Sequence, residues 1–332
     1  MERQYAADLK PGARVDAAFA LTAKEVRAAR TGEAYLVLEF TDRSGRIPGI
    51  MFRPRRDAES IPVGLVTRVR GVVTEYRGVT RISVESMQPA VSYDPSDMLP
   101  RGARDEDELL GHLRGLVRRV AHPGLAALLR VVFGDAGLMS RFKTCPASPG
   151  GHHAYLGGLL EHTVSVGQAC RQLSSMRPEL DSDLLLAGAL LHDVGVVDEV
   201  SYETGITQSD EGRLVGHVVL GERRVRQAIM QLGDRVSPET GTLLSHLVLS
   251  HHGDDLQGAM PPPATLEAIA LRHADRMDAE TAGFVEITKR ASQVGESWTD
   301  ADNAFGCSLR VPASGPQVRE VTDPARSIRR SA

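Results

Sequence analysis

The spacing of hydrophobic and polar positions changes about a third of the way along the chain. Between residues 14 and 87, short apolar stretches are separated by turns that contain glycine, at 41–45 and 77–78. This pattern predicts four or five short strands, including 34–40, 46–52, 65–76 and 79–87. So many strands in so few residues are typical of a small closed or partly open β-barrel, whereas a β-sandwich usually needs more.

A different period begins after a segment rich in proline, serine and charge. From Leu109 to about Phe284, apolar residues recur at the three- and four-residue spacing of helices. We therefore expect a multi-domain chain with an all-β barrel followed by an all-α domain. The expected ranges are 1–90 for the barrel, 91–107 for a linker, 108–290 for the helical domain and 291–332 for a polar, partly disordered tail.

Composition excludes several classes of protein. The 332 residues are 42% hydrophobic and 25% charged, which is ordinary for a globular protein, and no apolar run approaches the length of a membrane span. The first residues, 1–4, lack the apolar core of a secretory signal, and the three cysteines lie far apart. We expect a cytoplasmic protein with no membrane partner. The net charge of −4, with neither half strongly basic, means that a polyanion would have to meet a local patch.

Histidine is concentrated in the helical part. Nine of the eleven histidines lie between His152 and His273. The apolar stretch 184–191 predicts a buried helix, and His192 and Asp193 follow it directly. Burying an imidazole and a carboxylate without partners costs several kcal/mol, so a partner is predicted. Imidazole and carboxylate together suit a divalent ion such as Zn²⁺, Mn²⁺ or Fe²⁺.

The order of these residues along residues 140–285 resembles that of the HD-domain metal-dependent phosphohydrolases. The resemblance implies that one ion is held by His162, His192, Asp193 and Asp275. It also implies that a second ion is held by His217, His251 and His252, with Asp193 bridging both ions. Two divalent cations about 3.5–4 Å apart can clamp a phosphodiester and lower the pKa of a bound water. The expected cofactor is therefore a pair of divalent ions, Mn²⁺ first, with Mg²⁺, Fe²⁺, Co²⁺ or Zn²⁺ as alternatives.

Other residues near this series need separate predictions. Many HD enzymes carry a lysine where this chain has Val196, so Arg213 is the candidate substitute for a phosphate contact. Together with Asp193 and His153, Arg213 completes the expected catalytic set. On the last helix, we expect His273 to be packed and Asp278 to be a solvated carboxylate, with a role in supporting a neighbouring ligand as the alternative for Asp278.

Residues 12–90 resemble an OB-fold of the single-strand-binding type. The resemblance rests on 31–36 (TGEAYL), 42–47 (DRSGRI) and 69–76 (VRGVVTEY). Tyr35, Phe52 and Tyr76 are candidate stacking platforms, because stacking on an aromatic ring tolerates any base. A core position remains the alternative for Tyr35 and Phe52. The candidate contacts to backbone phosphates are Arg43, Arg46, Arg53, Arg55 and Arg56.

Taken together, the two parts resemble the bacterial OB-fold plus HD-domain 3′→5′ exoribonucleases of the YhaM type. Three stretches carry this resemblance: 152–163 (HHAYLGGLLEHT), 211–217 (EGRLVGH) and 249–253 (LSHHG). It implies a metal-dependent nuclease acting on single-stranded RNA, with action on DNA left open. Two alternatives remain: a phosphohydrolase of free nucleotides or nucleotide second messengers, and a single-strand-binding module with a catalytically degenerate HD domain. The sequence leaves open whether the chain forms a homo-oligomer.

Overall fold

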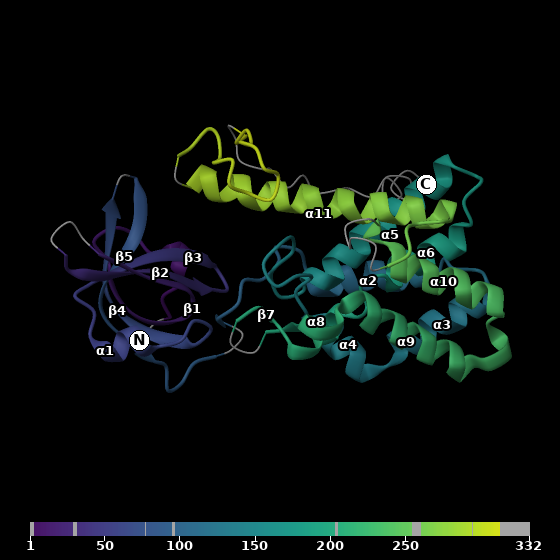
Figure 1. Ribbon diagram of the computed structural model, residues 1–332, viewed down its shortest axis with the longest axis horizontal. Coiled ribbons are helices and arrows are strands. Elements are labelled where there is room, and N and C mark those ends of the chain that lie inside the picture. The colour runs from purple at the N-terminus through teal and green to yellow at the C-terminus, as the bar shows by residue number, and fades with distance from the viewer. Residues whose placement is uncertain are drawn as a thin grey trace, which may run out of the picture. The chain divides into compact units, whose positions relative to one another are not determined.

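The computed structural model describes residues 3–28, 32–76, 78–94, 97–202, 205–253, 260–293 and 295–312 (Figure 1). The first residue of the predicted turn at 77–78 and half of the predicted tail, 294 and 313–332, lie outside these ranges. The chain divides into two compact units, Met1–Glu280 and Thr281–Ala332. The first unit contains both the barrel and the histidine-rich helices.

A closed five-stranded barrel forms the N-terminal part, as the alternating pattern predicts. Its strands are β1 (Arg14–Ala28), β2 (Ala34–Asp42), β3 (Gly45–Phe52), β4 (Val66–Tyr76) and β5 (Val79–Pro89). They follow the order β1-β2-β3-β5-β4, and the long strand β1 closes the barrel by pairing with both β2 and β4. β3 and β5 pair in parallel and the other neighbours are antiparallel. This is the small barrel architecture of an OB-fold.

Alternate residues of the strands fill the barrel interior. Phe19, Leu36, Phe40 and Ile82 are completely buried there. β1 has a register shift between Leu21 and Ala23, and irregularities of this kind bend a strand so that one strand can serve two neighbours. Two short helical turns, η1 (Ala6–Asp8) and α1 (Arg56–Ser60), accompany the strands.

Helices make up most of the rest of the first unit. They are α2 (Glu106–Val117), α3 (Pro123–Gly134), α4 (Ala136–Phe142), α5 (Gly158–Met176), α6 (Ser182–Leu191), α7 (Val196–Glu199), α8 (Asp210–Val215), α9 (His217–Leu232), η3 (Gly233–Arg235), α10 (Pro238–Ser250) and α11 (Leu266–Gln293). The helical prediction is confirmed with one correction. Strands β6 (Val200–Ser201) and β7 (Thr207–Gln208) form a short antiparallel pair, which brings the Gln208 amide to the carboxylate of Glu199.

The apolar helix α6 lies in the core of the helical part. Eight consecutive residues, Leu184 to Leu191, are buried, and the helix packs against α5 and α10. Its first turn is capped by Asp181, whose carboxylate accepts from two backbone N–H groups. The helix ends at Leu191, so His192 and Asp193 come at its C-terminus, as predicted.

The second unit contains the end of α11 and a turn-rich stretch. Within the part described, Trp298 and Arg310 form an isolated β-bridge, and Leu309 and Val311 are buried. None of the described helices is both long enough and apolar enough to span a membrane.

Candidate metal centre

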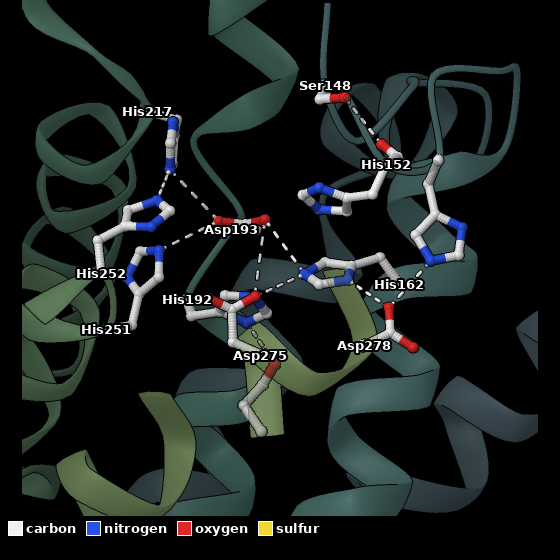
Figure 2. A network of polar contacts seen from close by, with 12 residues as sticks. Ser148, His152, His162, His192, Asp193, His217, His251, His252, Asp275 and Asp278 are labelled. Carbon is white, nitrogen blue, oxygen red and sulfur yellow. Dashed lines mark hydrogen bonds and ion pairs between the residues drawn. The ribbon is translucent and has the colours of Figure 1, made fainter. Parts of the chain in front are cut away.

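The candidate centre lies where several helices begin or end. His192 caps the C-terminus of α6, His251 caps the C-terminus of α10, and His217 is the first residue of α9. His162 lies inside α5, and Asp275 and Asp278 lie on α11. Figure 2 shows Asp193 in the middle, with His217, His251 and His252 on one side and His162 on the other.

One group of donors faces the Oδ2 atom of Asp193. Nε2 of His162 lies 3.5 Å and Nε2 of His192 lies 3.6 Å from that oxygen. Oδ1 of Asp275 lies 3.2 Å from the first of these nitrogens and 3.8 Å from the second. Donors that bind one ion at about 2.0–2.2 Å are themselves about 3–3.6 Å apart, so the donor atoms of His162, His192 and Asp193 are spaced as ligands of one cation, and Asp275 lies beside them.

A second group faces the other oxygen of the same carboxylate. Nε2 of His217 lies 3.5 Å and Nε2 of His251 lies 3.4 Å from Oδ1 of Asp193. His252 joins this group, with its Nε2 2.9 Å from Nε2 of His217. The two oxygens of Asp193 therefore each face a separate set of nitrogen donors, as the bridging role requires.

Four of the rings are oriented in the same way, with Nδ1 donating to an oxygen. The acceptors are the Ala189 carbonyl for His192 (2.8 Å), the Val248 carbonyl for His251 (2.7 Å), Asp278 for His162 (2.7 Å) and Glu199 for His217 (2.5 Å). A carbonyl can only accept, so Nδ1 carries the proton at His192 and His251 and Nε2 keeps its lone pair. Partners of this kind fix the tautomer of metal-binding histidines.

The donor set fits divalent cations better than it fits hydrogen bonding. Nε2 of His162 and Nε2 of His192 lie 3.1 Å apart, so the lone pairs of two neutral rings would repel each other unless a proton or a metal cation lies between them. Oδ1 of Asp193 and Nε2 of His251 are buried and, although close, have no hydrogen-bond partner among the described residues. A cation between these atoms would remove the repulsion and satisfy both buried groups.

The electrostatics of the centre agree with that fit. Burial opposes ionisation of Asp193 and Asp275, but the surrounding imidazoles outweigh it and hold the pKa of each carboxyl below its usual range. Burial lowers the pKa of His192 and lowers the pKa of His252 to about 4, so both rings are neutral near pH 7. Ionised carboxylates and neutral imidazoles are the forms that bind metal ions.

Two carboxylates behind the donors hold the rings in place. Burial alone would lower the pKa of His162, but hydrogen bonds with Asp275 and Asp278 raise it to about 10. His217 behaves similarly, because its bond to Glu199 outweighs burial and raises its pKa. Without a metal ion, both environments favour the protonated ring, so a cation that binds there would displace a proton from each. The prediction that Asp278 is solvated is wrong, because this carboxylate accepts from His162 and His153.

A glycine allows the two halves of the centre to meet. A Cβ atom on Gly195 would lie 2.1 Å from the carbonyl oxygen of His217 and 2.3 Å from the amide nitrogen of Gly221. Both are backbone atoms, so a larger residue at position 195 would have to shift the main chain of α9. The glycine two residues after Asp193 therefore lets the turn after α6 lie directly against the start of α9, which brings His217 to Asp193.

A cavity of about 320 Å³ opens beside the donors. His152 lines it, and Nε2 of that ring is buried without a hydrogen-bond partner among the described residues. His153, the predicted catalytic residue, instead uses both ring nitrogens, with Tyr155 at 2.6 Å and Asp278 at 2.9 Å. The backbone φ of +49° at His153 separates the directions of the two neighbouring rings. Of this pair, His152 is the cavity-lining residue that the sequence reasoning missed.

The structure brings the seven predicted ligands together but places other predicted residues elsewhere. Arg213 is exposed on α8 and is not among the residues that line the cavity, whereas Arg272 and Arg276 of α11 do line it. The prediction of a packed His273 is wrong, because it is exposed. Leu266, Ile269 and Met277 of the same helix are also 46–53% exposed.

The aromatic candidates of the barrel lie on its surface. Tyr35 on β2 and Phe52 on β3 are cross-strand partners whose ring centroids lie 5.8 Å apart. Phe52 is 59% exposed and Tyr35 is partly exposed, so neither is a core residue. Tyr76 is also exposed, with the guanidinium of Arg81 over its ring.

The five candidate arginines fall into two groups. Three of them already pair with carboxylates: Arg43 with Asp97, Arg46 with Glu39 and Arg53 with Glu33. Arg43 also lies over the ring of Tyr5. Its ion pair connects Asp97, which follows the barrel in sequence, to the turn between β2 and β3. Arg55 and Arg56 are exposed and form no ion pair with any residue that the structure describes.

Comparison with known proteins gives matches for both parts. Residues 159–280 match the HD domain family, and residues 21–90 match the OB-fold nucleic acid binding domain family. The 3′-5′ exoribonuclease YhaM of Bacillus velezensis is 29% identical over 275 residues, which cover 81% of this chain and 86% of that protein. The YhaM of Oceanobacillus iheyensis is 30% identical over 254 residues, covering 75% of this chain and 78% of the relative.

The Bacillus subtilis YhaM is 28% identical over 273 residues, again with 81% of this chain covered. These alignments extend over both parts of the chain, and the barrel, the helical part and the histidine series occur here in the expected order. The chain therefore belongs to the family of OB-fold plus HD-domain proteins that includes the YhaM 3′-5′ exoribonucleases.

Proposed function

We propose that this protein is a metal-dependent 3′→5′ exoribonuclease that shortens single-stranded RNA. The observation that carries the proposal is the pair of donor groups on the two oxygens of Asp193, which can hold two cations side by side. The direction of cutting and the RNA substrate are supported by the names of the relatives, which are 3′-5′ exoribonucleases.

The residues of the centre divide into two ligand sets. His162, His192, Asp275 and Oδ2 of Asp193 would hold one ion, and the second would be held by His217, His251, His252 and Oδ1 of Asp193. When bound, such a pair supplies Lewis-acid stabilisation of a phosphodiester and makes a nucleophile available from water near neutral pH. Neutral imidazoles add no negative charge, so the loaded centre would stay positive enough to attract phosphate.

The chain's own groups set the geometry of this chemistry. Glu199 and Asp278 orient His217 and His162 through short hydrogen bonds to Nδ1, so the Nε2 atoms cannot turn away. His152 points into the cavity with a free ring nitrogen, where it can contact a substrate oxygen. Because these groups are already fixed by packing, little reorganisation is needed when the substrate binds.

The barrel would select unpaired strands. The exposed pair Tyr35 and Phe52 offers a surface on which bases can stack, and a base in a duplex has both of its faces covered. Strands 2 and 3 of OB-folds form the face that binds oligonucleotides, and this is where the pair lies. Arg55 and Arg56, which form no ion pair with a described residue, follow β3 directly, and their guanidinium groups can contact the phosphates of the strand.

A hairpin RNA with a single-stranded 3′ overhang and a label at its 5′ end tests the proposal. With Mn²⁺, Mg²⁺ or Zn²⁺ supplied in turn, we expect a descending ladder that stops near the stem. Asp193→Asn, which keeps the shape of the side chain, is the control for contaminating nucleases. Immediate release of the labelled nucleotide would reverse the polarity, and a cut within the loop would indicate an endonuclease.

The matching DNA hairpin distinguishes RNA from DNA preference, which depends on contacts to the 2′-hydroxyl. Free nucleotides and nucleotide second messengers are assayed alongside. Hydrolysis of these small substrates, with no cleavage of any oligonucleotide, would replace the nuclease proposal with a small-nucleotide phosphohydrolase.

A further inference from the structure

Two arginines of α11 line the cavity beside the candidate metal centre. Arg272 and Arg276 are one helical turn apart and flank Asp275, and the cavity between them and the donors also touches His251 and His252. The sequence lacks the lysine that follows the HD-x-G residues of many HD enzymes, and Val196 stands in its place. A cation that contacts phosphate would therefore have to come from another element.

The two arginines differ in what surrounds them. Arg276 is exposed, and its Nε donates to Glu280 at 2.7 Å. Arg272 is partly buried and has neither a hydrogen bond nor an ion pair with any residue that the structure describes. Elsewhere in the helical part, partly buried arginines have carboxylates: Arg224 is held by Asp198 through two hydrogen bonds. Among the residues that the structure describes, the donors of Arg272 are therefore left to the cavity.

The Arg272 side chain lies directly against the backbone of Gly253. A Cβ atom on Gly253 would lie 2.4 Å from Nε and 2.5 Å from Cζ of Arg272, so the guanidinium group lies directly against the backbone of the glycine. The φ of +62° at Gly253 also disfavours any other residue. Because Gly253 follows His251 and His252, the guanidinium is fixed next to the second donor group.

A guanidinium group beside a site for divalent cations is stable only when an anion lies between the two positive charges. An arginine cannot lose its proton in a protein, so it repels a neighbouring divalent cation unless a negative group lies between the two charges. The planar fork of a guanidinium matches two oxygens of a phosphate. We propose that Arg272 binds the substrate phosphate at the metal centre, in place of the lysine that this chain lacks. This inference rests on the proposed nuclease function.

Binding of small probes to the purified, metal-containing protein gives the first test. Isothermal titration compares adenosine 5′-monophosphate with adenosine, which differs from it only by the phosphate. A lost charge-assisted hydrogen bond corresponds to about 10- to 100-fold in affinity. We expect Arg272→Ala to lower the affinity for the monophosphate by that factor and to leave the weak affinity for adenosine unchanged. Arg272→Lys keeps the charge without the fork and should recover only part of the loss.

Arg171→Ala is the matched control, since Arg171 is exposed on α5 and does not line the cavity. It should bind the monophosphate as the wild type does. On a single-stranded RNA, Arg272→Ala should lower kcat/KM by at least tenfold while the bound metal per chain stays at the wild-type value. A loss of metal together with activity would mean that Arg272 supports the donors, which would overturn the proposal.

Gly253→Ala tests the same contact from the other side. The new Cβ would displace the guanidinium, so this variant should lose part of its affinity for the monophosphate. In the double variant with Arg272→Ala, the loss of affinity should be little greater than for Arg272→Ala alone. Fully additive losses would mean that the glycine acts independently of Arg272 and would contradict the proposed contact.

The outcomes separate this inference from the proposed function. Phosphate binding that depends on Arg272, in a protein that cleaves no oligonucleotide, would reject the nuclease and keep the phosphate site. If the wild-type protein cleaves RNA but Arg272→Ala binds the monophosphate as tightly as the wild type, the proposed nuclease function stands and the phosphate site at Arg272 is rejected.

Discussion

The candidate metal centre and the outer face of the barrel differ in how firmly their side chains are held. In the centre, His162, His192 and His251 are buried to within 1% of completely, and each has a hydrogen-bond partner that fixes its ring. On the barrel, Phe52 and Tyr76 are more than half exposed. The centre is built before the substrate arrives, whereas the barrel presents side chains that can adjust to it.

The proposed function accounts for this difference. Chemistry on a phosphodiester needs charges held to within fractions of an ångström, which only packed and hydrogen-bonded groups provide. Binding a strand of any sequence needs flat surfaces and mobile cations that accept every base. We therefore expect large, all-or-none effects from substitutions in the centre and small, additive effects from those on the barrel.

The largest effect should come from Asp193→Asn. The change keeps the volume of the side chain but removes the charge that both donor groups share. We expect hydrolysis to fall on the order of 10⁴-fold, the scale seen when one member of a cooperative catalytic set is removed. Metal analysis and circular dichroism of the same sample give the bound ions and the fold. A folded variant with wild-type turnover would contradict the bridging role.

Glu199→Gln should have the next largest effect, and it should affect one ion more than the other. Glu199 accepts from Nδ1 of His217, and loss of such a partner typically costs 10- to 100-fold in metal affinity. Metal titrations of activity should show one weakened step that excess metal restores. Glu211→Gln, at an exposed carboxylate that pairs with Arg223, is the control. An unchanged titration would show that His217 needs no support from Glu199.

The sequence alone predicts the parts of this fold that depend on local periodicity. The buried stretch 184–191 ends where α6 ends, and the alternating strands of the barrel lie within a few residues of their predicted positions. The candidate ligands from His162 to Asp275 also converge, because His192, His217 and His251 lie at helix ends that the fold brings to His162 on α5 and Asp275 on α11. These features need only the period of the chain and the order of the motif.

What the sequence could not predict depends on which way single side chains face. His152 and His153 are neighbours, yet the ring of His153 contacts Asp278 while His152 lines the cavity, and the backbone at His153 has a positive φ that the sequence does not reveal. Helix α11 carries apolar residues on two faces, so its pattern alone does not show which one packs. The buried face is the one with Leu271 and Asp275, and His273 is exposed. Glu199 has no spacing signal, since its role depends on a contact across 18 residues.

A moderate effect is expected when the aromatic pair of the barrel is broken. Phe52→Ala should weaken binding of a long single strand by about 1–3 kcal/mol for the base that it stacks. Hydrolysis of a very short oligonucleotide should be unchanged, because the metal ligands all lie after residue 150. Fluorescence anisotropy with labelled RNA measures the first effect. Val63→Ala, at another exposed apolar residue of the barrel part, is the control, and an equal loss in both variants would reject stacking.

The smallest effect, and the sharpest test of the barrel's cations, concerns salt. Arg55 and Arg56 form no ion pairs with described residues, whereas Arg46 and Arg53 already face carboxylates at 3.1 Å and 2.9 Å. An arginine that newly neutralises a phosphate releases a counterion, so removing it lowers the slope of log affinity against log salt by about 1. We expect Arg55→Ala combined with Arg56→Ala to lower that slope by up to about 2. Arg46→Ala combined with Arg53→Ala should change it less, because each of these guanidinium groups must first leave its carboxylate. A titration from low to moderate salt on one single-stranded RNA compares the two double variants directly. If the paired arginines changed the slope more than the unpaired ones, the strand would follow the side of the barrel that carries Glu33 and Glu39.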